Sequence, residues 1–286
     1  MTPATQAAVD TLRRLTQTVE GAEINFATSA DASLRVMKAV DNPDVGMEDL
    51  ARIVTAEPLL SAKVVNMANS VALNPGGQKI AEIKPAVMRV GMAQIKSLAM
   101  ALTLDQLRQS RRLAPCRDLA NRLWERSIHV AALGYVVARR LTSLPADEAM
   151  LAGIVHDLSR FYLLGVAAEN EPELLNDLTS LLPALDEVGR EVTPRLFEVL
   201  GLPESISRAV VERDQYGSNM PPKSLAEVLF LACWLAPPSN PYEDAEARAG
   251  ARAQEGAALG LDRQTIADFV AASGDEIYSI VLALES

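Results

Sequence analysis

The stretch Gly153-Ile-Val-His156-Asp157-Leu-Ser159 contains one of only two histidines in a chain of 286 residues. A His-Asp pair at the end of a helix can supply two ligands to one metal ion, but a hydrolytic metal centre built from histidines needs more of them. The only other histidine is His129. The pair therefore indicates an ancestry in metal chemistry, while the histidine count argues against the chemistry itself.

The overall composition indicates an all-α fold. Hydrophobic residues make up 49% of the chain and aromatic residues only 4%. Ala, Leu and Val carry most of this hydrophobic content, which favours closely packed helices over sandwiched sheets. A chain of this length can form one large domain or two lobes that share a core.

The charges and cysteines exclude several classes of function. The net charge is −10 and the basic residues are dispersed, so nucleic acid is not expected as a partner. Cys116 and Cys233 have no Cys-x-x-Cys spacing, and we interpret both as small buried apolar residues in a reducing compartment. The N-terminus shows no secretory pattern, and the longest apolar segment, 225–238, contains Glu227 and is too short to span a bilayer. We expect a cytoplasmic protein with no membrane partner.

Helical periodicity recurs along most of the chain, with Pro, Gly and Asn residues at the breaks. Helices are expected at 31–40, 47–56, 58–70, 83–90, 92–109, 115–141, 147–155, 172–181, 184–200, 203–214, 224–236, 245–260 and 263–284, with a surface loop at 237–246. No strand alternation is sustained enough to predict a sheet. We expect a helical bundle lobe at 1–114 and a second helical lobe at 115–286, packed as one unit.

Six ordered segments carry a family resemblance. They are Ile53-Val-Thr-Ala-Glu-Pro-Leu59, Asn66-Met-Ala-Asn69-Ser70, Ala86-Val-Met-Arg-Val-Gly91, Trp124-Glu-Arg-Ser127, Gly153-Ile-Val-His156-Asp157-Leu-Ser159 and Gly201-Leu-Pro-Glu204. In this order they resemble the HDOD domain, a regulatory output module of bacterial signalling proteins related to HD-type metal-dependent phosphohydrolases. The resemblance covers about residues 16–215 and implies a two-lobed all-α architecture.

The chain departs from this pattern at the residues that would bind metal. Arg126 stands where the resemblance implies the first metal-binding histidine of active HD enzymes, and a guanidinium has no lone pair for a metal. No histidine follows His156, although related proteins often carry a His-His pair near 210–214. A metal would have only His156, Asp157 and distant carboxylates, which are Asp186, Glu187, Glu191 and Asp214. We expect no bound metal or other cofactor.

Two side chains of the predicted helix 115–141 complete the hypothesis for this vestigial site. We expect Arg126 to replace the positive charge of the metal and to pair with Asp157, because a buried carboxylate without a partner costs several kcal/mol. His129 is three residues further on and projects about 60° away on a helix, so it is a possible rescue ligand. The alternative for His129 is a single hydrogen-bonded histidine at a boundary between helices.

The sequence and the resemblance together imply a non-catalytic signalling or scaffold module. Its vestigial HD site would consist of Arg126, His156 and Asp157, and it would act through a signalling protein partner or a small-molecule effector. Two alternatives stay open. One is a metal-dependent phosphohydrolase or cyclic-nucleotide phosphodiesterase, and the other is an effector that binds a nucleotide without hydrolysing it.

Overall fold

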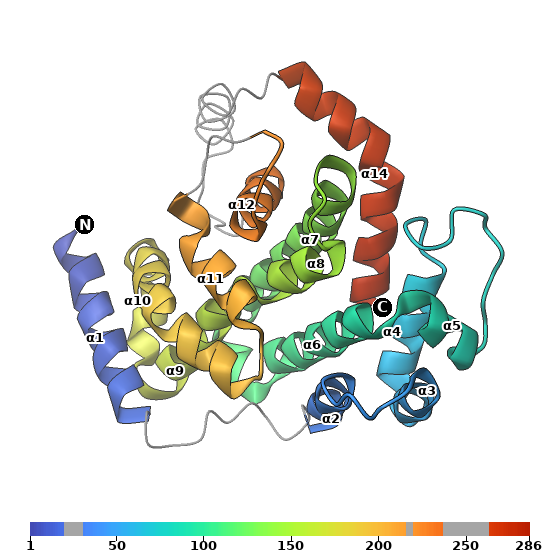
Figure 1. Ribbon diagram of the computed structural model, residues 1–286. Helices are drawn as coiled ribbons and strands as arrows, with labels where there is room; N and C mark the ends of the chain where they lie inside the picture. The colour runs from blue at the N-terminus through green and yellow to red at the C-terminus, as the bar shows by residue number, and fades with distance from the viewer. Residues whose placement is uncertain (20–30, 216–219, 237–262) are drawn as a thin grey trace.

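The computed structural model describes residues 1–19, 31–215, 220–236 and 263–286, and every regular element in these ranges is a helix (Figure 1). This confirms the predicted all-α fold. The helices are α1 (Pro3–Val19), α2 (Asp31–Val40), α3 (Met47–Thr55), α4 (Pro58–Ala68), α5 (Ile83–Val90), α6 (Met92–Gln109), α7 (Arg117–Leu141), α8 (Ala146–Val155), α9 (Leu158–Asn170), α10 (Leu178–Val199), α11 (Glu204–Glu212), α12 (Leu225–Leu235) and α14 (Arg263–Glu285). The predicted helix 245–260 and loop 237–246 lie outside the described residues.

The two central helices, α7 and α8, pack closely. Small residues allow this approach. At Gly153 of α8, an added Cβ atom would lie 2.5 Å from the Cα atom of Ala131 in α7, and at Gly134 it would lie 3.0 Å from the carbonyl oxygen of Ala149. The glycine of the quoted stretch therefore fixes how near α8, and the His156-Asp157 pair at its end, lie to α7.

Helices α2 to α6 pack against one another (Figure 1). Asn69 ends α4 and holds the following loop, because its side chain donates to the carbonyl oxygens of Val65 and Ile80 and accepts from the Ile80 amide. Gly91, with a φ of 80°, then turns the chain by 104° between α5 and α6. A glycine adopts this left-handed conformation without strain, which explains the break that the sequence places there.

The segments 158–170 and 172–200 differ from the sequence prediction. Helix α9, which the periodicity did not single out, follows His156-Asp157 directly, and α10 is one helix that contains Pro183 and Pro194 in place of two helices. The contacts of α10 with α1, α9 and α11 outweigh the loss of backbone hydrogen bonds at the prolines. The predicted helix 115–141 begins later, at Arg117, because Pro115 lies in a short 3₁₀ helix (Arg111–Cys116) that precedes α7.

The helices at the two ends of the chain each pack against distant elements (Figure 1). Helix α1 lies on α9 and α10, and α14 runs along α7 to α4. Glu276 of α14 accepts hydrogen bonds from Arg139 and Arg140 of α7, and Lys63 of α4 donates to the carbonyl oxygen of Leu284 at 2.6 Å. The boundary between 114 and 115 stays a prediction, since these contacts and a continuous core join the two parts.

Among the described residues, the stretch Ala146–Asn170, which is α8 and α9 together, is long and apolar enough to cross a membrane by these criteria alone. Most of it is buried inside the protein, with 94% of its apolar window covered. A central helix pair of a folded core has the same composition, so the apolar character of this stretch reflects packing within the protein.

Candidate functional site

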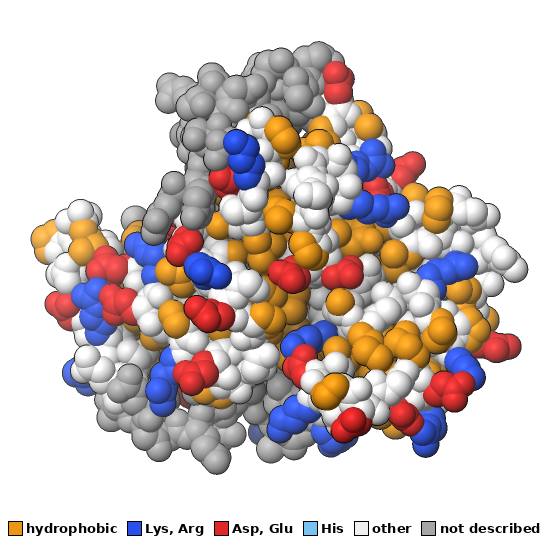
Figure 2. Space-filling model, viewed as in Figure 1, with side chains coloured by type: hydrophobic (Ala, Val, Ile, Leu, Met, Phe, Trp, Pro, Cys, Tyr) orange, Lys and Arg blue, Asp and Glu red, His pale blue; other side chains and the backbone are white. Residues whose placement is uncertain are grey.

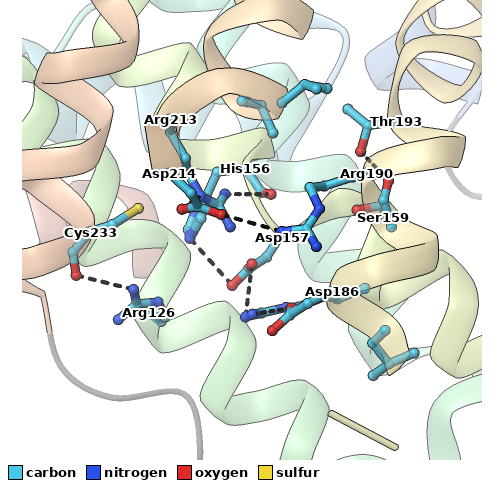
Figure 3. Close-up of a pocket in the computed structure, with 15 residues that line it drawn as sticks. Arg126, His156, Asp157, Ser159, Asp186, Arg190, Thr193, Arg213, Asp214 and Cys233 are labelled. Carbon is cyan, nitrogen blue, oxygen red and sulfur yellow. Dashed lines mark hydrogen bonds and ion pairs between the residues drawn. The ribbon is translucent and has the colours of Figure 1, made fainter. Parts of the chain in front are cut away.

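A cavity of about 260 Å³ opens at the point where α8 ends and α9 begins. Its walls come from α7, α9, α10, α11 and α12, and His156 and Asp157 form its floor (Figure 3). The charged and thiol side chains that line it are Arg126, His156, Asp157, Arg160, Asp186, Arg190, Arg213, Asp214 and Cys233. The structure thus brings the predicted residues Arg126, His156 and Asp157 into one pocket.

His156 and Asp157 are buried, with 3% and 1% of their surfaces exposed. The Nδ1 atom of His156 is 2.7 Å from the carbonyl oxygen of Gly153, so Nδ1 carries a proton and donates. Its Nε2 atom is 3.3 Å from Asp157 Oδ2. These two atoms lie at ion-pair distance but not at a hydrogen-bonding angle, and neither has a hydrogen-bond partner among the described residues.

The charges of the pair stabilise each other. Burial alone would lower the pKa of His156, but the carboxylate of Asp157 and the Cys233 side chain outweigh it and raise this pKa to about 9. Burial would raise the pKa of Asp157, but Arg160, His156 and Arg126 hold it well below its usual value. At neutral pH the pocket therefore contains an imidazolium beside a carboxylate.

Arg160 is the cation nearest to Asp157, and the sequence analysis did not identify it. Its Nη1 atom is 3.1 Å from Asp157 Oδ1, and its Nε atom donates to Asp186 Oδ1 at 2.6 Å. The spacing of three residues between Asp157 and Arg160 places both on one face at the start of α9, which is a signal that the sequence does contain.

Arg126 approaches the pocket from α7, and its Nη2 atom donates to the carbonyl oxygen of Cys233 at 3.0 Å (Figure 3). Its positive charge lowers the pKa of Asp157. The ion pairs of Asp157 that the structure resolves are those with Arg160 and His156. Arg126 thus acts on the carboxylate through its charge, and the closest counter-charge comes from α9 instead of α7.

His129 does not line the pocket. Its Nδ1 atom is 2.7 Å from the carbonyl oxygen of Glu125 on its own helix, so the ring is a hydrogen-bonded histidine on the side of α7. Two of the distant carboxylates are also placed elsewhere, because Glu187 and Glu191 pair with Arg13 of α1. The structure therefore does not bring these three residues to His156.

Cys233 requires a correction, because it is only partly buried and lines a polar pocket. It lines the pocket beside His156, and although burial alone would raise the pKa of its thiol, the charges of His156, Arg213 and Arg126 lower this pKa to about 7. Cys116, in contrast, is buried with a pKa raised to about 11 by burial. The interpretation from the sequence suits Cys116 only.

The residues present do not fit a hydrolytic metal centre. In the described part of the chain, no three His, Cys, Asp or Glu side chains converge in a way that could hold a metal ion. Arg126 and Arg213 place guanidinium groups around His156, and the protonated imidazole has no lone pair to give until its proton is lost.

Comparison with known proteins agrees with this geometry at the level of fold. A presumed metal-dependent phosphohydrolase from Shewanella amazonensis SB2B is 22% identical, with a TM-score of 0.74 over 99% of this chain and 100% of that one. A presumed signal transduction protein from Marinobacter aquaeolei VT8 is 20% identical, with a TM-score of 0.56 over 90% of this chain and 59% of that one. An HDOD domain protein of unknown function from Geobacter sulfurreducens is 19% identical, with a TM-score of 0.53 over 90% of this chain and 91% of that one.

Sequence comparison gives the family. A curated but uncharacterised protein of Treponema pallidum (strain Nichols) is 24% identical over 169 residues, which are 58% of this chain and 30% of that protein. This chain therefore spans less than a third of that relative. The model of the HDOD domain matches residues 27–211, which is more than half of the chain. The protein with the His156-Asp157 pocket is a member of the HDOD domain family.

Proposed function

We propose that this chain is a non-catalytic signal-transduction or scaffold module with a degenerate HD site, which acts by binding a protein partner or a small effector. The observation that carries the proposal is the place of Arg126. It stands where the resemblance implies a metal-binding histidine, and it lines the same pocket as His156 and Asp157. An arginine stays protonated and cannot bind a metal, so the substitution removes a ligand and adds a positive charge.

The protonation of the remaining pair supports the proposal. A histidine must be neutral to bind a metal, and the pKa of His156 is raised to about 9. The Asp157 carboxylate is held by Arg160 at 3.1 Å, so metal binding would have to displace an ion pair in a buried position. Both effects lower the affinity of the pocket for a divalent cation.

The alternative of a metal-dependent phosphohydrolase or cyclic-nucleotide phosphodiesterase has weaker support. It would need a metal held by His156, Asp157 and one of the pocket carboxylates, Asp186 or Asp214. Asp186 is paired with Arg160, and Asp214 lies 3.3 Å from Arg213. An effector that binds a nucleotide without hydrolysing it is compatible with the proposal, because the pocket walls carry several cationic side chains.

Metal content and turnover test the proposal. The protein would be purified without chelator, assayed for Mn, Fe and Zn by mass spectrometry, and then incubated with phosphomonoester and phosphodiester substrates plus each metal. We expect substoichiometric metal and no turnover. Stoichiometric metal, together with turnover that disappears in the His156→Ala variant, would establish the enzyme instead. The Arg126→His variant is the positive control for metal, since it restores a donor and should bind Zn²⁺ more tightly than the natural chain.

The proposal also places the protein in the bacterial cytoplasm with a signalling protein as its partner. Both described cysteines are free thiols, which suits a reducing compartment.

A further inference from the structure

We propose that the His156-Asp157 pocket binds the phosphate group of a small phosphate monoester. This inference names the effector class for the proposed non-catalytic function and so rests on it. The pocket has an excess of positive charge within an acidic protein. Four arginines face three carboxylates in the lining, whereas the whole chain has a net charge of −10.

The face shown in Figure 2 carries charges of both signs, with acidic and basic side chains interspersed. Within the pocket, the side chains of Arg126, Arg160, Arg190 and Arg213 gather around one cavity. An anionic ligand would gain from these charges.

Two of the arginines are held only loosely. Arg190 lies 3.8 Å from Asp214 Oδ2, which is beyond hydrogen-bonding distance, and its side chain is 54% exposed. Arg213 donates from Nε to Asp214 and from Nη1 to the carbonyl oxygen of His156, at 3.3 Å in both cases. A guanidinium has five N–H donors, so these long contacts leave donors on both side chains for an incoming oxyanion. They come from different elements, α10 and the 3₁₀ turn Arg213–Gln215, and both point toward the Asp157 region (Figure 3).

His156 lies at the floor of the same cavity and is 3% exposed. Its Nε2 atom is 3.3 Å from Asp157 Oδ2, so the buried carboxylate already has a partner and leaves Arg190 and Arg213 for another anion. The convergence of Arg190 and Arg213, which come from two elements, on one cavity is the geometric basis of the proposal.

The charge and size of the cavity select the ligand class. A phosphate monoester carries up to two negative charges and three oxygens, which match several guanidinium forks, whereas one carboxylate is satisfied by a single fork. The cavity of about 260 Å³ lies just below the 300–1,000 Å³ usual for drug-sized ligands, so it suits a phosphate with a compact organic group. Leu185, Val210 and Val211 supply an apolar wall against which that group can pack.

The test compares phenyl phosphate, inorganic phosphate and benzoate at matched ionic strength. Binding to the full chain would be measured by calorimetry and by thermal stabilisation. We expect phenyl phosphate to bind more tightly than inorganic phosphate, and benzoate to bind least. Bound phosphate should also slow the alkylation of Cys233 by iodoacetamide, because Cys233 lines the cavity that the ligand would fill. Equal stabilisation by benzoate and phenyl phosphate would overturn the assignment of phosphate.

A matched pair of variants locates the site. Arg190 and Arg195 both lie on α10 and are well exposed, but only Arg190 lines the pocket. We expect Arg190→Met to weaken phenyl phosphate binding roughly tenfold, as the loss of one charge-assisted hydrogen bond implies, and Arg195→Met to leave it unchanged. Equal affinity in the two variants would show that the anion binds elsewhere and would refute the site.

The same experiment separates this inference from the proposed function. Hydrolysis of phenyl phosphate by the purified chain would refute the non-catalytic function while the phosphate site stands. Absence of both binding and turnover would refute the phosphate site and leave a protein partner as the remaining mode of action.

Discussion

Arg160 lies one helical turn after Asp157, and its Nη1 atom is 3.1 Å from Asp157 Oδ1 in a buried position. In an HD enzyme the resemblance implies a metal next to this aspartate. Here a guanidinium on the same helix supplies the positive charge. The arrangement explains how a carboxylate with 1% of its surface exposed stays ionised.

Replacing Asp157 tests this account. The Asp157→Asn variant removes the carboxylate and leaves His156 and Arg160 without their shared buried counter-charge, so we expect a loss of about 3 kcal/mol in the free energy of unfolding. Urea unfolding at pH 7 measures it. The control is Asp186→Asn, which removes a carboxylate that pairs with the same arginine but is 42% exposed, and should cost below about 1 kcal/mol. Equal losses in the two variants would contradict a structural role for the buried pair.

Gly153 should tolerate no side chain. A Cβ atom at this position would lie 2.5 Å from Ala131 Cα and 2.6 Å from its backbone nitrogen, so α8 would have to move away from α7. We expect Gly153→Ala to destabilise the protein by about 2–3 kcal/mol, measured by urea unfolding.

Another helical glycine is the control for Gly153. At Gly274 of α14 an added Cβ atom meets nothing within 4 Å. Gly274→Ala should therefore stabilise the protein by about 0.5–1 kcal/mol, because alanine favours the helix. If Gly153→Ala were as stable as the natural chain, the close approach of α7 and α8 would be wrong.

The sequence predicted the helices that have clear ends. Asp31–Val40, Ile83–Val90 and Met92–Gln109 have the expected bounds. Asn42 and Pro43 follow the first of them, and Gly91 separates the other two. It failed where tertiary packing outweighs local signals. We predicted a break between residues 181 and 184, but α10 continues through Pro183 because its buried face packs on α1 and α9. Helix α9 was missed because its residues are apolar on several faces and show weak periodicity.

Only part of the pocket could be predicted from the sequence. The family resemblance identified Arg126, His156 and Asp157, and the spacing of Arg160 from Asp157 could have added a fourth residue. Cys233, which is 77 positions after His156, reaches the pocket because α12 packs on α7, α8 and α11. Contacts of this range depend on how helices are arranged in space, and a single sequence contains no local signal for them.

The stability of the protein should depend on pH through two opposing groups in the pocket. The pKa of His156 rises from 6.5 to about 9 on folding, so its contribution is complete below pH 6.5 and is lost as the pH rises through 9. The pKa of Cys233 falls from 9.0 to about 7, so its contribution is lost as the pH falls through 7 and is complete above pH 9. Between these limits the two trends partly cancel in the natural chain.

The Cys233→Ala variant should remove this cancellation. We expect its free energy of unfolding to fall more steeply above pH 6.5 than that of the natural chain, measured by urea unfolding at several pH values. The fall should end below pH 9, because Cys233 contributes to the raised pKa of His156. The control is Cys116→Ala, compared at pH values below the 9.0 of the unfolded thiol, because folding raises the pKa of Cys116 from there to about 11. A Cys233→Ala curve parallel to that of the natural chain would show that folding does not lower the pKa of Cys233.

The attachment of α14 should depend on Glu276. This glutamate is 8% exposed and accepts from Arg139 Nη1 at 2.8 Å and Arg140 Nε at 2.9 Å, so one carboxylate joins α14 to two residues of α7. Both arginines are more than 40% exposed, which reduces the cost of losing the contact. We expect Glu276→Ala to destabilise the protein by about 1–2 kcal/mol and to increase hydrogen exchange along α14.

The neighbouring residue provides the control for Glu276. Asp275 is exposed on the same turn of α14, so Asp275→Ala removes a negative charge from the helix without removing a buried contact. It should leave the exchange of α14 close to that of the natural chain. If hydrogen exchange along α14 were equally slow in both variants, apolar packing of Ile280 and Leu284 alone would hold the helix, and the two arginine contacts would contribute little.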